Sequence, residues 1–566
     1  MIAVAGLFVE LPLVASTTYI TGTPDSLSTF HGVRRASEVF AATLAQTTTY
    51  YVDSATTKNA LKLGERGIVA MLSGLDPYTE YLPEDSREDF EVMATGAYAG
   101  IGAYIQQVDS IVYIRYPMEG SPARKAGLGV GDAILAIDGE KMIPGTPTLV
   151  SSKLKGPIGT SVRVLVQPLG EKEPREVTIA RDNVVLDQVV SSGVYQDSIG
   201  YIRLSGFTTG SAQDVRRAYD RLTEEAGGRL SGLILDLRSN GGGVMDGAID
   251  ILGMFVPERT KVLYTKGRLP ETSKTYYTET PPIAPDLPLV VLINGGSASA
   301  SEILAGALQD LDRAVLVGSK SFGKGLVQTT LPLPYNGLLK VTISRYYIPS
   351  GRCIQQLDYS HRNPDGSVAA VPDSLTNTFF TAKGRPVKDG GGIRPDVEVE
   401  SETMNAIVFA MLSEGALFKF ANQLYLERPK AKQLSEVVIT DEDIDRLIDR
   451  LEKDGLEYGE MSLEALKALE RVAKWEGYTE ESTKETIEKL KVELTPSLRR
   501  DVKASQEQTK RMLRGLLALH YFGERGENAV TLEADPTFEE ALKIMSSKER
   551  QDEILQKPTE VSVASH

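Results

Sequence analysis

The stretch from residue 289 to residue 328 constrains the fold of this chain more than any other. Residues 289–293 and 314–317 are short, wholly apolar runs, which are typical of strands buried on both faces. Between them, apolar residues recur at helical spacing. These are Ile303, Leu304, Ala307, Leu308 and Leu311. The order predicts a buried strand, a helix that begins near Ser297 or Ser299, and a second buried strand.

A serine at the start of this helix has the surroundings of a nucleophile. It faces unsatisfied backbone N–H groups and the positive end of the helix dipole, which suit an alkoxide or an oxyanion. A serine hydroxyl also needs a base. The stretch contains none of the chain's four histidines, but it contains Lys324, and no Asp or Glu lies between residues 316 and 330. A lysine desolvated without a partner has a lowered pKa and can act as a base.

Two simpler interpretations compete with this one. Ser299 and Glu302 fit the S-x-x-E capping box, so that the serine could only cap the helix. Residues 318–324 also spell G-x-x-x-x-G-K, the start of a P-loop. Residue 325 is glycine, which has no hydroxyl for Mg²⁺, and the next residues resemble a strand instead of a helix. The sequence therefore disfavours nucleotide binding.

The same stretch resembles the C-terminal processing peptidases, the tail-specific serine proteases with a Ser/Lys dyad. It carries S-A-S-A-S-E-I at residues 297–303 and F-G-K-G-L-V-Q at residues 322–328. The resemblance implies that Ser299 is the nucleophile and that Lys324, 324 − 299 = 25 positions later, is the base. It also implies that Gln328 orients the base, and that Ser299 can cap the helix as well.

A glycine-rich loop follows an earlier apolar strand at residues 233–238. The run D-L-R-S-N-G-G-G at residues 236–243 resembles the oxyanion-hole loop of the same peptidases. The resemblance implies that the N–H groups of Gly242 and Ala300 bind the oxyanion, with Gly241 or Gly243 as neighbouring candidates. Alternatively, the loop is a βα turn without chemistry. Alternating strands and helices predict a parallel sheet covered by helices.

Residues 94–182 resemble a PDZ domain. Residues 131–139, G-D-A-I-L-A-I-D-G, match a PDZ hallmark, and residues 154–160 match the L-K-G-x-x-G-T run of the family. PDZ domains bind a C-terminal peptide as an added strand and hold its carboxylate with backbone N–H groups. By resemblance, the residues that do so are Tyr98, Ala99, Gly100, Ile101 and Gly102. The alternative is a plain hairpin.

The two ends of the chain differ in character. Residues 1–24 are largely apolar and resemble an export signal or membrane anchor, although Glu10 interrupts the run and no basic residue precedes Arg34. The resemblance implies a location in the cell envelope, in the bacterial periplasm. Residues 25–93 have a helical pattern. Residues 401–566 form a charged helical extension with a disordered end at residues 557–566, suited to adaptor docking or self-association. In it, Thr440 predicts a helix start and Gly455 its end.

The chain is therefore predicted to be a multidomain α/β protein. The resemblance implies a crotonase/ClpP-like protease core at residues 183–400 with an inserted PDZ domain. The expected function is serine endopeptidase action on proteins or peptides, engaged near their C-termini. The alternatives are a catalytically idle PDZ scaffold and a crotonase-like fold with acyl-CoA chemistry. A net charge of −15 argues against nucleic acid, and the single cysteine argues against a disulfide or a cysteine-rich metal site. We expect no cofactor and no metal.

Overall fold

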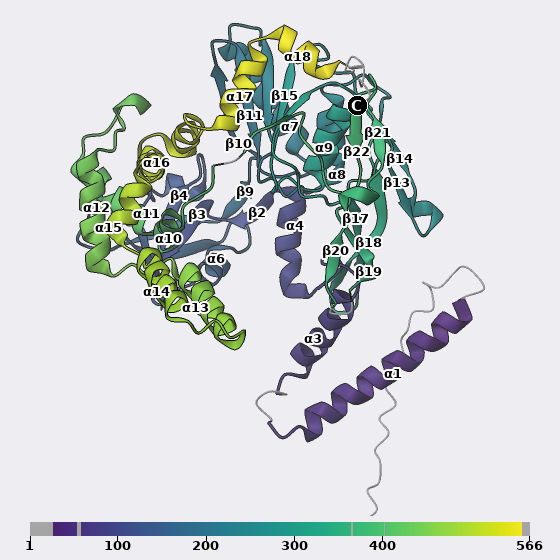
Figure 1. The fold of residues 1–566 in the computed structure, drawn as a ribbon, viewed down its shortest axis with the longest axis horizontal. Coiled ribbons are helices and arrows are strands. Elements are labelled where there is room, and N and C mark those ends of the chain that lie inside the picture. The colour runs from purple at the N-terminus through teal and green to yellow at the C-terminus, as the bar shows by residue number, and fades with distance from the viewer. Residues whose placement is uncertain (1–25, 54–57, 364–365, 401, 557–566) are drawn as a thin grey trace, which may run out of the picture. The chain divides into compact units, whose positions relative to one another are not determined.

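The strand at residues 289–293 lies inside a six-stranded sheet (Figure 1). The computed structural model describes residues 26–53, 58–363, 366–400 and 402–556. They divide into two units. One comprises residues up to 84 together with 329–342, and the other comprises residues 85–328 and 343 onward. The signal predicted at residues 1–24 and the disorder predicted at residues 557–566 both concern segments outside the described residues.

The six-stranded sheet of the larger unit is parallel except for one edge strand. Its order is β10 (Val189–Tyr195), β11 (Ile199–Leu204), β12 (Gly232–Asp236), β15 (Leu289–Ile293), β16 (Val315–Gly318) and β23 (Val397–Glu398). Only β10 runs antiparallel to its neighbour. Every residue of β12, β15 and β16 is buried, which explains their continuous apolar sequences. The prediction of two buried strands around a helix is confirmed.

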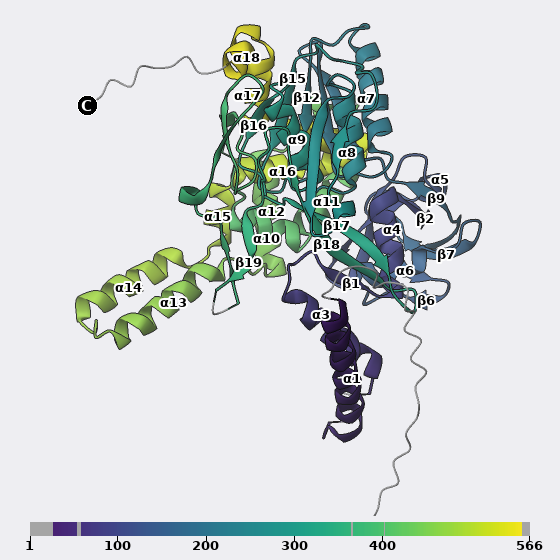
Figure 2. The same cartoon turned by 90° about the vertical axis from the view of Figure 1, so that its right-hand side faces the viewer.

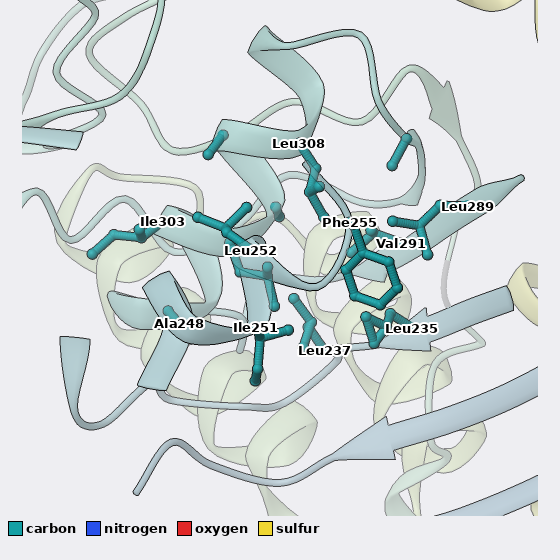
Figure 3. Close-up of a cluster of buried hydrophobic side chains, with 14 of the residues drawn as sticks. Leu235, Leu237, Ala248, Ile251, Leu252, Phe255, Leu289, Val291, Ile303 and Leu308 are labelled. Carbon is teal, nitrogen blue, oxygen red and sulfur yellow. The ribbon is translucent and has the colours of Figure 1, made fainter. Parts of the chain in front are cut away.

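One face of this sheet is covered by three helices. They are α7 (Ser211–Glu225), α8 (Met245–Gly253) and α9 (Ala300–Asp310). Leu252 of α8 and Ile303 and Leu308 of α9 share an apolar cluster with Leu235 and Val291 of the sheet (Figure 3). Burial of these side chains fixes the position at which α9 begins, because the helix cannot slide without exposing them.

The opposite face is covered by a helix from the end of the chain, α17 (Pro536–Met545). Its Phe538 and Ile544 pack on side chains of β11, β12, β15 and β16. Arg238, just after β12, binds Asp236 at 2.6 Å and also binds Asp535, the N-cap of α17, at 2.6 Å. The glycine-rich loop and helix α17 are thus joined through one half-buried guanidinium.

The segment that resembles a PDZ domain forms its own antiparallel sheet. The strand order is β3 (Ala103–Val108), β4 (Ile111–Pro117), β5 (Ala133–Ile137), β7 (Ser161–Gln167) and β8 (Arg175–Ala180), and β6 (Glu140–Lys141) pairs with β5. Two helices accompany it, α5 (Pro122–Lys125) and α6 (Pro147–Leu154). A separate pair, β2 (Ala97–Gly100) and β9 (Asp182–Val185), connects it to the rest of the chain. Within the described residues β3 pairs only with β4, so its outer edge is open.

Further strands and helices complete the larger unit. They are α4 (Arg87–Thr95), β13 (Lys261–Gly267), β14 (Thr275–Tyr277), and the hairpins β19 (Leu357–Arg362) with β20 (Val368–Ala370) and β21 (Thr378–Phe380) with β22 (Pro386–Lys388). Strand β13 pairs with β14 and with the last residues of β18 (Leu338–Tyr347). Strand β17 (Leu326–Pro332) leads out of the loop that carries Lys324.

The C-terminal extension is helical, as predicted. It comprises α10 (Ala406–Ser413), α11 (Ala416–Glu427), α12 (Asp441–Asp454), α13 (Glu460–Trp475), α14 (Glu481–Leu494), α15 (Leu498–Ala504), α16 (Gln506–Leu532), α17 and α18 (Lys548–Leu555). Helix α12 starts with Thr440 as its N-cap and ends at Gly455 in the left-handed conformation, which confirms both predicted boundaries. Val108 of β3 is buried in the apolar cluster of α11 and α16.

The smaller unit contains the helices α1 (Ser26–Tyr50) and α3 (Ala60–Ser73) and the short strand β1 (Glu80–Leu82). Helix α1 packs on α3, where Gly67 leaves room for the ring of Phe40. Strand β1 pairs antiparallel with the first residues of β18. None of the helices in the described part of the chain has the length and apolar character needed to span a membrane.

Candidate active site

Ser299 stands where strand β15 turns into helix α9. It is the N-cap of the helix, and its backbone has φ 56° and ψ −113°. A positive φ is unfavourable for a serine and persists only where the surrounding structure holds it. The side chain is half-buried, and its hydroxyl makes no capping hydrogen bond within the described structure. The hydroxyl is therefore available for chemistry.

The two flanking serines have structural roles instead. Ser297 is fully buried, and its hydroxyl donates to the carbonyl of Leu237 at 2.8 Å. Ser301 is also fully buried, and its hydroxyl donates to the carbonyl of Asn240 at 2.8 Å. These bonds fasten the start of α9 to the glycine-rich loop. Of the three serines in the S-A-S-A-S run, only Ser299 combines exposure with an uncommitted hydroxyl.

A buried carboxylate connects the serine to the lysine loop. Oε2 of Glu302 accepts hydrogen bonds from the backbone N–H of Ser299 at 2.8 Å and from that of Lys324 at 2.9 Å. Oε1 accepts from the hydroxyl of Ser321 at 2.5 Å and from the N–H of Gly323 at 2.6 Å. Burial raises the pKa of Glu302 to about 7, against the opposing effect of these four donors. One side chain thus holds both candidate catalytic residues by their main chains.

Tyr346 provides a second connection between the two segments. Its hydroxyl donates to the carbonyl of Lys324 at 2.8 Å and lies 3.3 Å from the carbonyl of Ser299. The ring is 1% exposed, so its position is fixed by the core. The sequence did not single out this tyrosine, because it lies 22 residues beyond Lys324 in strand β18 and carries no motif of its own.

The glycines on either side of Lys324 let a neighbouring loop pack directly on its backbone. A Cβ at residue 323 would lie 2.6 Å from Cβ of Gln356, and one at residue 325 would lie 2.9 Å from the backbone nitrogen of Gln355. The N–H of Gly325 donates to Oε1 of Gln355 at 2.8 Å. Lys324 itself is half-buried. The F-G-K-G sequence therefore reflects close packing around the lysine.

Gln328 lies in strand β17, four residues after Lys324, and is half-buried. The structure places it on the strand that extends the lysine loop. Its implied role of orienting the base stays a prediction.

The glycine-rich loop lies directly against Ser299. Gly242 has φ +97°, and a Cβ there would lie 2.9 Å from Cβ of Ser299 and 2.9 Å from the nitrogen of Ala300. The N–H of Ala300, at the first helical position, points out of the helix start. The N–H of Gly242 donates to Oδ1 of Asn240 at 2.9 Å. In this conformation Gly242 therefore lies beside the serine with its N–H group engaged.

Asn240 is a residue that the sequence interpretation passed over. It is fully buried, its Nδ2 donates to the carbonyl of Leu204 at 2.8 Å, and its carbonyl accepts from Ala298 at 3.0 Å. It therefore joins three segments of the site. The signal that could have identified it was its place in the D-L-R-S-N-G-G-G run, directly before the three glycines.

The residues expected to bind a peptide carboxylate divide between a strand and a loop. Tyr98, Ala99 and Gly100 lie in β2, which pairs with β9. Ile101 and Gly102 lie between β2 and β3, and Gly102 has φ +73°. The ring of Tyr98 covers Gly100, since a Cβ at residue 100 would lie 2.7 Å from a ring carbon. The open edge that could accept a peptide strand belongs to β3, directly after this loop.

Metal binding has no visible basis in the described residues. There, no group of three or more His, Cys, Asp or Glu side chains is arranged to hold a metal ion.

Comparison with known proteins gives matches to three parts of the chain. Residues 198–368 match the model of peptidase family S41, residues 113–168 match a PDZ domain model, and residues 407–545 match a model described as a probable PDZ-protease, C-terminal helical domain.

Two curated relatives are similar over more than half of the chain. A carboxy-terminal-processing protease of Bartonella bacilliformis is 35% identical over 353 residues, which cover 62% of this chain and 79% of the relative. A carboxyl-terminal-processing protease of Synechocystis is 38% identical over 296 residues, covering 51% and 68%. Among solved structures, a photosystem II D1 C-terminal processing protease is 26% identical with a TM-score of 0.33, covering 64% of this chain and 92% of that one.

Replacing Glu302 by Gln should impair the site and alter the pH dependence of stability. Glutamine keeps the volume, but its NH₂ group cannot accept from the surrounding donors, and we expect at least about a tenfold loss of protein cleavage. Because folding raises the pKa of Glu302 from 4.5 to about 7, its contribution to the free energy of unfolding is greatest below pH 4.5 and is lost as the pH rises through 7.

Urea titrations at several pH values measure this effect. The difference in unfolding free energy between wild type and Glu302→Gln should fall by on the order of 3 kcal/mol between about pH 4 and about pH 8. Glu442→Gln, an exposed acid in the first turn of α12, is the matched control and should change neither quantity. A pH-independent difference, or full activity of Glu302→Gln, would contradict the assignment.

Proposed function

Because this chain belongs to the carboxy-terminal-processing proteases of peptidase family S41 and is a serine-type peptidase, we propose that Ser299 and Lys324 are its catalytic dyad. The observation that carries the proposal is the shared carboxylate of Glu302, which binds the main chains of both residues. The uncommitted hydroxyl of Ser299, between two serines that are structurally engaged, supports the choice of nucleophile.

The proposed reaction proceeds through an acyl-enzyme. The neutral amine of Lys324 takes the proton from the Ser299 hydroxyl, and Oγ attacks the scissile carbonyl. The tetrahedral intermediate collapses, the C–N bond breaks, and the lysine returns the proton to the leaving amine. A water molecule, deprotonated in turn by Lys324, then hydrolyses the ester. Gln328 orients the lysine between these steps.

Backbone N–H groups beside Ser299 stabilise the oxyanion in this proposal. The N–H of Ala300 belongs to the first turn of α9 and adds the positive end of the helix dipole. Gly242 supplies the second donor once its N–H exchanges Oδ1 of Asn240 for the reacting oxygen. Gly241 and Gly243 are its neighbouring candidates. The present hydrogen bond to Asn240 thus describes a resting arrangement of the loop.

We further propose that the PDZ domain binds the C-terminal end of a protein or peptide substrate. Residues 98–102, at the end of β2 and in the loop after it, would hold the carboxylate, and the substrate would add a strand at the unpaired edge of β3. The helices after residue 401 would dock an adaptor or a second copy of the chain.

Active-site variants test the dyad. Ser299→Ala and Lys324→Ala should each reduce cleavage of an unfolded protein by at least about a thousandfold. Lys324→Arg should be equally inactive, because a guanidinium cannot give up its proton to act as a base. A fluorophosphonate probe should label wild type at Ser299 and should label neither lysine variant.

Lys320→Ala, four residues before Lys324, is the matched control and should retain cleavage. Persistent cleavage by Lys324→Ala would rule out the lysine as base. Binding of a C-terminal peptide without any cleavage by wild type would favour the idle scaffold instead.

A substrate with an amidated C-terminus tests recognition by the PDZ domain. Removing the terminal negative charge should raise KM by about tenfold or more while kcat changes little, since the scissile bond is untouched. A substrate acetylated at its N-terminus is the control. Equal KM values for the free and the amidated substrate would contradict recruitment through the C-terminus.

We also propose a cell-envelope location, on the basis of the apolar residues 1–24. Fractionation of cells that express the full chain should recover it with the periplasm or the membrane. Recovery in the cytosolic fraction alone would contradict this location.

A further inference from the structure

Helix α13 has two apolar faces, although a helix in a hairpin needs only one. Helix α13 packs on α14 (Figure 2), and its Leu466 is 7% exposed. On another face of α13, Met461 and Trp475 are 87% and 86% exposed, and Leu469 and Val472 are 55% and 49% exposed. At 100° per residue, these four residues and Ala465 fall within an arc of roughly 120°.

This second face, which we call the α13 stripe, is separate from the folded core. The buried apolar clusters of the described chain include no side chain of α13 or α14. Single exposed apolar residues are common, but a continuous stripe along a helix marks a surface that another chain covers. Trp475 is the only tryptophan of the protein.

We propose that the α13 stripe pairs with the α13 stripe of a second copy, antiparallel and about a two-fold axis. The order of residues along the stripe is nearly palindromic. In an antiparallel pair of identical helices, residues that face each other have residue numbers with a constant sum. Met461 and Trp475 give 461 + 475 = 936, and Ala465 and Val472 give 465 + 472 = 937. Antiparallel pairing centred between residues 468 and 469 therefore sets apolar side chains against apolar side chains along the whole contact.

Charges beside the stripe specify the same orientation. Glu464 and Arg471 border it on one side, with the sum 464 + 471 = 935. Antiparallel pairing brings Glu464 close to Arg471 of the partner subunit, and symmetry repeats this contact. In a parallel pair this border would instead face the other border of the partner's stripe, so that Glu464 and Arg471 would not meet. In the single chain Glu464 binds Lys467 at 2.8 Å, an exposed pair that contributes little stability.

A second copy explains these features better than an unrelated adaptor does. An adaptor would need a complementary surface, but it would not require the stripe to be complementary to itself. The inference makes the proposed self-association specific. Dimer formation does not depend on the peptidase chemistry. It is measured by sedimentation and by Trp475 emission, and the Ser299→Ala variant can be used for both measurements.

Association of the full-length protein through the α13 stripe can be followed by the fluorescence of its sole tryptophan, Trp475. Sedimentation over the micromolar range should show a monomer–dimer equilibrium, and the emission of Trp475 should shift to shorter wavelength in step with it. Val472→Glu should weaken association by at least tenfold and abolish the concentration dependence of the emission. Val492→Glu, at a 72% exposed position of α14, is the matched control and should preserve both.

A charge exchange tests the orientation. Glu464→Arg should weaken the dimer several-fold, because it sets two arginines together, and the double variant Glu464→Arg/Arg471→Glu should restore it. A protein that stays monomeric, a dimer unaffected by Val472→Glu, or a dimer whose formation leaves the Trp475 emission unchanged would overturn the proposal. Failure of the double variant to recover would overturn the antiparallel arrangement.

Discussion

The buried carboxylate of Glu302 is the interaction on which the site depends. Ser299 follows β15 and Lys324 lies in a loop after β16, so the parallel pairing of these strands brings both segments to one edge of the sheet without joining them directly. Glu302 accepts hydrogen bonds from both main chains, and from Ser321 and Gly323. A buried acceptor with this many partners is costly to disrupt, because each donor would lose a hydrogen bond that replaces its bond to water.

The sheet fixes the positions from which both segments start, the one with Ser299 after β15 and the one with Lys324 after β16. Strands β15 and β16 are fully buried between α7–α9 on one face and α17 on the other. Dispersion and burial hold their register, and the strained backbone of Ser299 persists because β15 and α9 on either side of it are packed in the core. The packed core therefore stabilises a backbone conformation at Ser299 that an unfolded chain would rarely adopt.

Much of this arrangement was predictable from the sequence. Continuous apolar runs gave β15 and β16, and helical spacing gave α9, because such patterns depend only on burial. The capping box was half right, since Glu302 accepts from the N–H of Ser299 while the serine hydroxyl stays out of the cap. The contacts of Tyr346 and Asn240 were not predictable, because they join residues distant in sequence. Likewise, pairing of β2 with β9 depends on a partner 82 to 88 positions away.

The link from Arg238 to Asp535 has a consequence for biosynthesis. Helix α17 begins at residue 536, 536 − 236 = 300 positions after the end of β12, so one face of the sheet stays uncovered until residues 536 onward have left the ribosome. The guanidinium beside the glycine-rich loop gains its second carboxylate only then. A nascent chain that has not yet reached α17 therefore lacks this stabilising contact beside the glycine-rich loop.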